Sequence, residues 1–299
     1  MNGILCIDKP ATFTSFDVIA KMRGIVGERK MGHAGTLDPM ATGVLPVFMG
    51  TATKAIPLME DHTKSYRASF RLGITTDTQD IWGKTLATKP FSACKGDVLD
   101  TLNFFRGKIL QTPPMVSAVQ VNGQRLYDLA RKGIEVERTP REIEISRLEL
   151  VDCDEEKGEY TVDITCSQGT YIRTLCFDLG ERLGCGATMT ALRRTHSCTF
   201  TLADCLTLDD LQRIKNEGGL FPVLPVKRAF ENLPDVTVSE AQTTRFTNGG
   251  ELAADRVRGL QGEGDYCVLS PAGTFLGIGT LQGDTLLVRK LFARKEDIV

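Results

Sequence analysis

The sequence predicts an α+β fold, in which a mixed, largely antiparallel sheet core with flanking helices is followed by a small C-terminal β-barrel. Three observations lead to this class. Segments in which apolar and polar residues alternate, such as 64–72, indicate strands with one buried face. Segments with helical spacing of apolar residues, such as 97–105, lie between them. From Leu233 onward, short apolar runs are separated by glycine-rich turns, which is typical of a small barrel.

In the first part of the chain, strands are expected at 3–7, 44–49 and 64–72, and helices at 16–26, 51–59 and 97–105. Ser15 is the expected N-cap of the first helix, whose buried face should include Phe16. Pro57 limits the second helix. In the strand at 64–72, alternation places Tyr66 and Phe70 on the buried face. A loop is expected at 89–95.

Further along the chain, helices are expected at 125–132, 170–183 and 207–216, and strands at 143–153 and 160–166. An Asn-Gly turn at 122–123 precedes the first of these helices. Thr170 is the expected cap of the second, and Thr207 begins the third with Asp210 at capping-box distance. Arg173 falls in a first helical turn, where the helix dipole disfavours a cation, so a carboxylate partner is expected.

The length and composition set limits on the class of protein. A chain of 299 residues allows one large domain or two, and Pro222 and Pro225 suggest domains at 1–228 and 229–299. No apolar run approaches the roughly 18 residues of a membrane span, and the N-terminus lacks signal-peptide features. The nine cysteines are scattered without a C-x-x-C pair, which predicts neither disulfides nor a metal site and favours the cytoplasm.

The net charge of −2 argues mildly against a nucleic-acid partner. The basic residues nevertheless gather in clusters, and a basic face on a near-neutral protein is enough to bind RNA. Ordinary solvated surface charge explains any single cluster equally well. The clusters are Lys21-Arg23-Arg29-Lys30, Arg125-Arg131-Lys132, Arg138-Arg141, Arg193-Arg194 and Arg289-Lys290.

The segment 31–54, MGHAGTLDPMATGVLPVFMGTATK, is the most informative stretch of the chain. Gly32, Gly35 and Pro39 make an extended helix unfavourable there, so His33 and Asp38 are expected on a shaped loop just before a core strand. Rigid elements commonly present reactive groups on such loops. Taken singly, Asp38 is explained as a turn residue and His33 as a structural histidine.

As a whole, the segment resembles the signature of the TruB-type tRNA pseudouridine synthases, GHxGTLDPxATGVL followed by GxATK. Six further stretches resemble the same family: K-x-Y at 64–66, LGxxTDTxD at 72–80, residues 112–123, GTYIR at 169–173, residues 183–187 and LRR at 192–194. The resemblance implies a pseudouridine synthase fold and, more loosely, a C-terminal RNA-binding domain of the PUA type. It implies activity on uridine 55 in the T loop of tRNA.

The resemblance also assigns roles to individual residues. It implies that Asp38 is the catalytic aspartate, that Arg173 pairs with it and that Tyr66 stacks on the target uracil. It implies that His33 enters the T loop. Further expected substrate contacts are Gly32, Lys64, Asp80 and Leu192. Contacts to the RNA backbone are expected from Lys9, Arg125, Arg131, Lys132 and Arg193.

Pseudouridine formation breaks the N1–C1′ bond, turns the base and joins C5 to C1′, so neither a cofactor nor a metal is expected. Asp38 can attack C1′ as a nucleophile or act first on the C2′ proton, and the sequence leaves both routes open. Tyr66 is a candidate for removing the C5 proton, directly or through a water. The target uridine must be flipped out of the folded loop, at a cost of a few kcal/mol.

Three rival functions share some of these features. A guide-RNA-directed relative shares the GTLDP core, but this chain lacks long basic tails, which favours a standalone enzyme that needs no guide RNA. A monomer is expected. A non-catalytic RNA-binding protein would not require Asp38, Tyr66 and Arg173 together. A nucleoside hydrolase also uses an aspartate near C1′ and would release free uracil. The chain contains neither a Walker loop nor a dinucleotide fingerprint.

Overall fold

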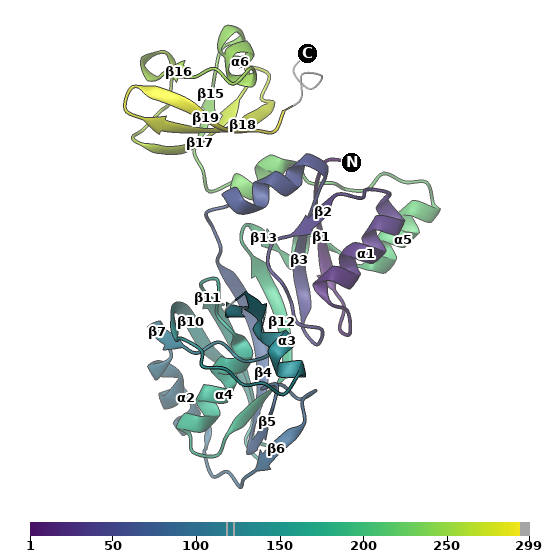
Figure 1. Cartoon of the computed structure of the whole chain (residues 1–299), viewed down its shortest axis with the longest axis vertical. Helices are drawn as coiled ribbons and strands as arrows, with labels where there is room; N and C mark the ends of the chain where they lie inside the picture. Colours follow the sequence, from purple (N-terminus) through teal and green to yellow (C-terminus); the bar gives the residue numbers. More distant parts are fainter. Residues whose placement is uncertain (118, 122, 294–299) are drawn as a thin grey trace.

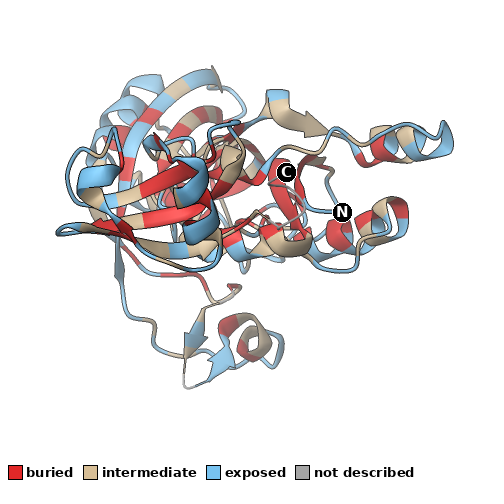
Figure 2. Ribbon diagram, turned by 90° about the horizontal axis from the view of Figure 1, so that it is seen from above, coloured by how far each residue is buried: buried red, intermediate tan, exposed pale blue. Residues whose placement is uncertain are grey.

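The structure is a computed structural model that describes residues 1–117, 119–121 and 123–293. Figure 1 shows a large sheet with helices packed around it and a separate, smaller C-terminal sheet at one end of the molecule. This arrangement confirms the predicted α+β class with a mixed, largely antiparallel sheet. The buried residues follow the two sheets and the inner faces of the helices (Figure 2).

The large sheet has ten strands and runs in the order β14-β1-β3-β12-β4-β11-β10-β7, with β2 paired to β3 and β13 paired to β12. Within this sheet, the β1–β14 and β3–β12 pairs are parallel and the other described pairs are antiparallel. Its strands are β1 (Gly3–Lys9), β2 (Met31–His33), β3 (Thr42–Met49), β4 (Lys64–Leu72), β7 (Gly107–Gln111), β10 (Arg141–Asp154), β11 (Glu159–Cys166), β12 (Ala187–Ser197), β13 (Phe200–Thr201) and β14 (Cys205–Leu206).

The central strand β4 confirms the alternation read from the sequence. Tyr66, Phe70 and the other alternate residues of this strand face the core. The opposite face carries Arg67, whose guanidinium is paired at 2.8 Å with Asp163 on β11. One face therefore builds the core, and the other meets solvent.

The helices cover the sheet and connect its strands. Those of eight residues or more are α1 (Ser15–Val26), α2 (Lys95–Phe104), α4 (Ile172–Arg182), α5 (Leu208–Asn216) and α6 (Glu240–Thr247), with the 3₁₀ helix η1 (Gly50–Leu58). Shorter elements are the hairpin β5 (Ile74–Thr76) and β6 (Thr85–Thr88), the pair β8 (Gln120–Val121) and β9 (Gln124–Arg125), α3 (Leu126–Arg131), η2 (Leu202–Asp204), η3 (Val226–Phe230) and η4 (Ala254–Arg256). Asn122 of the expected turn lies outside the described residues.

Two predicted helix caps were wrong. The N-cap of α1 is Thr14, which forms a capping box with Asp17, whereas Ser15 accepts a hydrogen bond from the Leu37 amide at 2.8 Å. Phe16, predicted to be buried, is 64% exposed. The helix α4 begins after Tyr171, one residue later than expected, and has no side-chain cap. Ser15 therefore joins α1 to the loop that carries Asp38.

The C-terminal sheet has five strands in the order β15-β17-β18-β19-β16 and fits the predicted small barrel. Phe230, Phe275 and Phe292 pack together where it meets the larger sheet, with ring centroids 5.7–6.2 Å apart. The predicted boundary at 228/229 lies inside η3. The strands are β15 (Asp235–Thr237), β16 (Leu252–Ala253), β17 (Gly264–Leu269), β18 (Phe275–Gln282) and β19 (Thr285–Leu291).

None of the helices in the described parts of the chain has the length and apolar character required to span a bilayer.

Close packing between β3 and β12 predicts an effect of substitution at Gly43. This residue has φ +101°, and a Cβ there would lie 2.1 Å from the Arg194 carbonyl oxygen. We expect Gly43→Ala to lower the free energy of unfolding by about 2–5 kcal/mol, because backbone strain and overpacking act together. Denaturant unfolding measures it. The matched control is Gly24→Ala in α1, where a Cβ meets nothing within 4 Å; an equal loss there would contradict the explanation.

Candidate active site

Asp38 lies in the loop between β2 and β3, as the sequence predicted, and the loop is held from several sides. The Ala34 amide donates to the Pro46 carbonyl at 3.1 Å. The Leu37 amide donates to the Ser15 hydroxyl at 2.8 Å, and the Leu37 side chain is buried in the core. The backbone next to Asp38 is therefore fixed to β3, to α1 and to the core.

The Asp38 carboxylate forms a bidentate ion pair with Arg173. The guanidinium Nε donates to Oδ2 at 2.8 Å and Nη2 donates to Oδ1 at 3.3 Å. The arginine is 4% exposed, and it also donates to two backbone carbonyls, from Nη1 to Thr78 and from Nη2 to Val116, both at 2.9 Å. The carboxylate partner expected for a cation in this first helical turn is confirmed, and the Asp38 side chain remains 38% exposed.

Asp80 is a second carboxylate beside the same arginine, with Oδ2 3.9 Å from Nη1 of Arg173. It is buried, and its Oδ1 accepts hydrogen bonds from the Thr78 hydroxyl and the Trp82 amide. The Arg173 guanidinium thus forms ion pairs with two carboxylates. Asp80 does not line the cavity, so its contact with the site is through the arginine.

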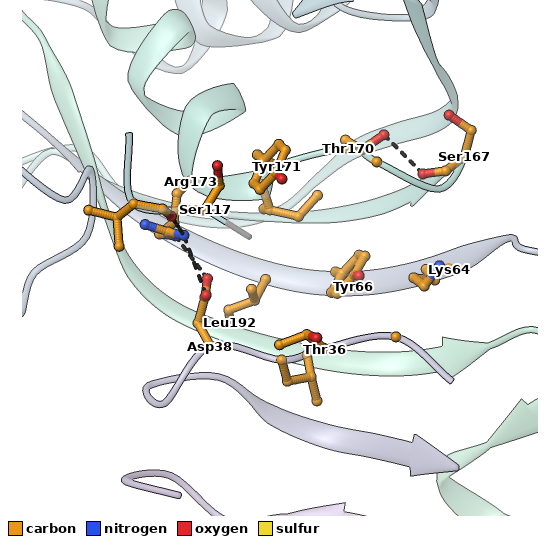
Figure 3. Close-up of a pocket in the computed structure, with 15 residues that line it drawn as sticks. Thr36, Asp38, Lys64, Tyr66, Ser117, Ser167, Thr170, Tyr171, Arg173 and Leu192 are labelled. Atoms are coloured by element: carbon orange, nitrogen blue, oxygen red, sulfur yellow. Dashed lines mark hydrogen bonds and ion pairs between the residues drawn. The ribbon is translucent and has the colours of Figure 1, made fainter. Parts of the chain in front are cut away.

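A cavity of about 290 Å³ opens beside the ion pair, close to the lower end of the range of roughly 300–1,000 Å³ for small-molecule sites. Tyr66 and Lys64 follow one another along β4 on one wall, and Leu192 of β12 lies between them and Asp38 (Figure 3). The loop before α4 covers the opposite side. The other lining residues are Gly35, Thr36, Leu37, Val116, Ser117, Ser167, Gly169, Thr170, Tyr171 and Ile172.

Burial sets the protonation of the groups on the β4 wall. It raises the pKa of Tyr66 to about 12, although the nearby Arg194 charge acts in the opposite direction. The tyrosine is therefore a neutral phenol at physiological pH. Burial also lowers the pKa of Lys64, whose ammonium donates to the His62 carbonyl at 3.1 Å.

His33 ends β2 and faces a larger adjoining cleft of about 910 Å³, which Asp38 also lines. Its Nδ1 is buried and has no hydrogen-bond partner among the residues described. Burial, and secondly the charge of Arg194, lowers the pKa of His33, so the imidazole is neutral at pH 7. Phe16, Arg125 and Arg131 lie on other parts of the same cleft.

The remaining predicted contacts lie farther from the cavity. Gly32 is on β2, where a Cβ would approach the Ile56 side chain at 3.2 Å, and it does not line the cavity. Arg125, Arg131 and Lys132 together line a hollow beside α3, so their contact with RNA backbone stays a prediction. Arg193 is half-exposed and paired with Asp8 at 2.7 Å, away from the cavity.

The prediction for Lys9 was wrong. The side chain is fully buried, and its ammonium donates to the carbonyls of Pro10, Phe13 and Pro39. Burial lowers its pKa to about 8. Lys9 therefore cannot contact an RNA phosphate in this structure, and instead it holds the backbone directly after Asp38. Arg194 is also fully buried and does not belong to a basic face.

Sequence reasoning missed several residues of the site. Tyr171 and Ser117 line the cavity without having been assigned a role. A signal for Tyr171 existed, since this aromatic residue stands two positions before Arg173. Ser117 lies in the stretch 112–123, which is part of the family resemblance, but that resemblance assigned Ser117 no role. No group of three metal-binding side chains occurs within the described residues.

Comparison with known proteins gives consistent matches over most of the chain. The family profile "TruB family pseudouridylate synthase (N terminal domain)" matches residues 23–172, and "tRNA pseudouridylate synthase B C-terminal domain" matches residues 173–226. A curated tRNA pseudouridine synthase B from Syntrophomonas wolfei is 44% identical, over 92% of this chain and 95% of that protein. The protein of the same name from Pseudomonas syringae is 40% identical, over 99% and 97%.

Two solved structures share the fold. A Cbf5-Nop10-Gar1 complex contains a chain with a TM-score of 0.77 and 25% identity, covering 99% of this chain and 86% of that one. An H/ACA RNP bound to a substrate RNA containing 2′-deoxyuridine gives a TM-score of 0.75 with 23% identity, covering 98% and 86%. These likenesses confirm the pseudouridine synthase fold expected from the sequence.

Proposed function

This chain belongs to the TruB family of pseudouridylate synthases and isomerises uridine in tRNA to pseudouridine, and we propose that its target is uridine 55 of the T loop. The observation that carries the proposal is the accessible Asp38 carboxylate, paired with the buried Arg173 at the edge of a cavity of about 290 Å³. A single nucleoside is the part of a tRNA that suits such a cavity.

Asp38 is the residue that we assign to the ribose. Its carboxylate either attacks C1′ as the N1–C1′ bond breaks, with the electrons passing to the uracil ring, or removes the C2′ proton first. Arg173 fixes the plane of the carboxylate through two hydrogen bonds and is itself fixed by two backbone carbonyls. Reactive geometry is thereby set before the substrate arrives.

Tyr66 and Leu192 are the residues that we assign to the base. The tyrosine ring offers a stacking surface while the uracil turns, and Leu192 bounds the space from the neighbouring strand. Because the pKa of Tyr66 is about 12, its resting form is not a phenolate. It can serve in removal of the C5 proton only if its own hydroxyl proton is passed on, for example to a water.

We assign the larger cleft to the T loop. Flipping the uridine costs a few kcal/mol, and the neutral imidazole of His33 borders the cleft where it can occupy the vacated space. Arg125, Arg131 and Lys132 would bind phosphates. Residues 1–228 form the catalytic domain in this proposal, and 229–299 form a PUA-like RNA-binding domain.

We further propose that the protein acts as a cytoplasmic monomer without a guide RNA. The support is that the curated relatives named tRNA pseudouridine synthase B match nearly their whole length. The rival is guide-dependent modification, since structural neighbours come from Cbf5 and H/ACA complexes. A guide-independent enzyme modifies a bare tRNA, whereas a guide-dependent enzyme does not.

The experiment is tritium release from an unmodified tRNA transcript made with 5-tritiated uridine, with a chelator and no other RNA. We expect one tritium released per tRNA and none from a transcript carrying cytidine in place of uridine 55. Release that requires an added RNA would establish guide dependence. Loss of free uracil from the RNA would instead identify a hydrolase.

Removal of one oxygen atom separates the two roles of Tyr66. The variant Tyr66→Phe keeps the ring for stacking and loses the hydroxyl for proton transfer. We expect kcat for tritium release to fall by about 10²–10⁴-fold, the usual contribution of a positioned proton-transfer group, with KM changed by less than about threefold. An unchanged kcat would restrict Tyr66 to stacking.

A further inference from the structure

Arg194 is an unusual buried cation next to the proposed active site. It lies on β12, its side chain is fully buried, and it is the largest such side chain in the described part of the protein. No carboxylate lies within 4.0 Å of its guanidinium among the described residues. Arginines are rarely buried completely unless they are paired. A specific set of contacts must therefore compensate for its loss of hydration.

Those contacts are backbone carbonyls on both sides of the Asp38 loop. The guanidinium Nε donates to the Val44 carbonyl of β3 at 2.8 Å. Nη2 donates to the Gly35 carbonyl at 3.1 Å and Nη1 donates to the Thr36 carbonyl at 3.3 Å. The side chain thus joins a strand of the central sheet to the two residues that lead into Leu37 and Asp38.

The same residue also abuts the opposite wall of the cavity. In the antiparallel pairing of β12 with β4, Arg194 stands directly opposite Tyr66, and directly opposed residues project on the same face. The positive charge lowers the pKa of Tyr66 against the larger effect of burial. Arg194 therefore lies between the element that carries the tyrosine and the loop that carries the aspartate.

The residues around Arg194 are packed closely against it. Gly35 has φ +88°, and a Cβ on it would lie 3.4 Å from Nη1 of Arg194 and 3.0 Å from Cε of Lys64. On the other side, the Arg194 backbone is pressed against Gly43. The loop is packed directly onto the guanidinium, so displacement of the guanidinium would be transmitted to the loop.

We propose that Arg194 is a positioning residue for pseudouridine formation, which fixes the separation between the Asp38 loop and the Tyr66 wall. It touches no reacting atom, since it does not line the cavity, and its burial rules out a phosphate contact in this structure. The expected effect of Arg194 on kcat rests on the proposed function. The expected rigidity of residues 34–38 does not depend on that function.

The kinetic test compares Arg194→Lys and Arg194→Met in the tritium-release assay at saturating tRNA. We expect Met to lower kcat by about 10²-fold with KM within about threefold of wild type, because a displacement near 1 Å of a reacting group has that effect. Lysine keeps the charge and some of the hydrogen bonds to carbonyls, so kcat of Arg194→Lys should be several-fold higher than kcat of Arg194→Met.

The control is Phe200→Leu, a fully buried residue on β13, which pairs with β12, and Phe200 does not line the cavity. It should reduce thermal stability without reducing kcat. A folded Arg194→Lys or Arg194→Met with wild-type kcat would overturn the proposal, as would a loss confined to KM. Global unfolding of both variants would also count against it, since Arg194 would then be a general stabilising residue.

Hydrogen exchange tests the structural role of Arg194 independently of enzymatic activity. Peptides covering residues 34–38 should exchange faster in both Arg194 variants than in wild type, whereas peptides from β10 and β11 should not change. Faster exchange with an inactive wild-type enzyme would leave the structural inference standing and refute the function. Unchanged exchange in this loop would refute the inference even if the wild-type enzyme is fully active.

Discussion

Asp38→Asn should abolish pseudouridine formation while leaving tRNA binding intact. We expect the single-turnover rate of tritium release to fall by more than about 10⁴-fold, since the variant removes the group assigned to the ribose chemistry. The side chain keeps its size, and the loop keeps its bonds to Pro46, Ser15 and Arg194. Filter binding should give a Kd within about threefold of wild type, because the proposed RNA contacts lie elsewhere.

Asp163→Asn is the matched control for this variant. Asp163 is also a carboxylate paired with an arginine at 2.8 Å, but it lies on the outer face of β11. We expect its release rate to equal that of wild type. If Asp38→Asn retained more than about a hundredth of the rate, the ribose chemistry would not require the Asp38 carboxylate, and Asp38 would lose its assigned role.

Arg173→Lys should combine a kinetic loss with a loss of stability. Lysine cannot reproduce the fork that binds both Asp38 oxygens and the carbonyls of Thr78 and Val116. We expect kcat to fall by about 10²-fold, because the carboxylate is no longer held in one plane. The free energy of unfolding should fall by roughly 1–3 kcal/mol, because buried carbonyls and Asp80 lose a partner.

Arg67→Lys provides the comparison. Arg67 forms a bidentate pair with Asp163 in which both hydrogen bonds are 2.8 Å, but its side chain is 56% exposed. Exposed pairs contribute about 0–1 kcal/mol, so stability should change within that range and kcat should not change. If both lysine variants behaved alike in kcat, the burial and position of Arg173 would have no bearing on catalysis.

Local patterns predicted those elements whose structure depends on neighbouring residues. The strand β4 and its buried face followed from alternation, and α5 followed from the capping box of Thr207 and Asp210. Two errors were failures to use signals that were present. Thr14 and Asp17 have capping-box spacing, and so do Ser239 and Gln242 before α6, which was not predicted.

The buried cations could not be predicted in this way. Lys9 and Arg194 looked like surface charge, because a single sequence shows charge but not the long-range partners that compensate for burial. The Arg194 guanidinium binds carbonyls more than 140 residues away in the chain. A glycine-rich loop has carbonyls without partners in a sheet or helix, and these need donors from elsewhere. The fold supplies those donors from β1 and β12.

We expect this chain alone to convert one flipped uridine of the tRNA T loop at the cavity beside Asp38. The most direct measurement maps pseudouridine at nucleotide resolution in a bare tRNA transcript after one turnover, by carbodiimide treatment and primer extension. We predict a single modified position, uridine 55, with wild type and with Asp163→Asn, and none with Asp38→Asn. Modification at another position, modification by Asp38→Asn, or no modification until a second RNA is added would contradict the account.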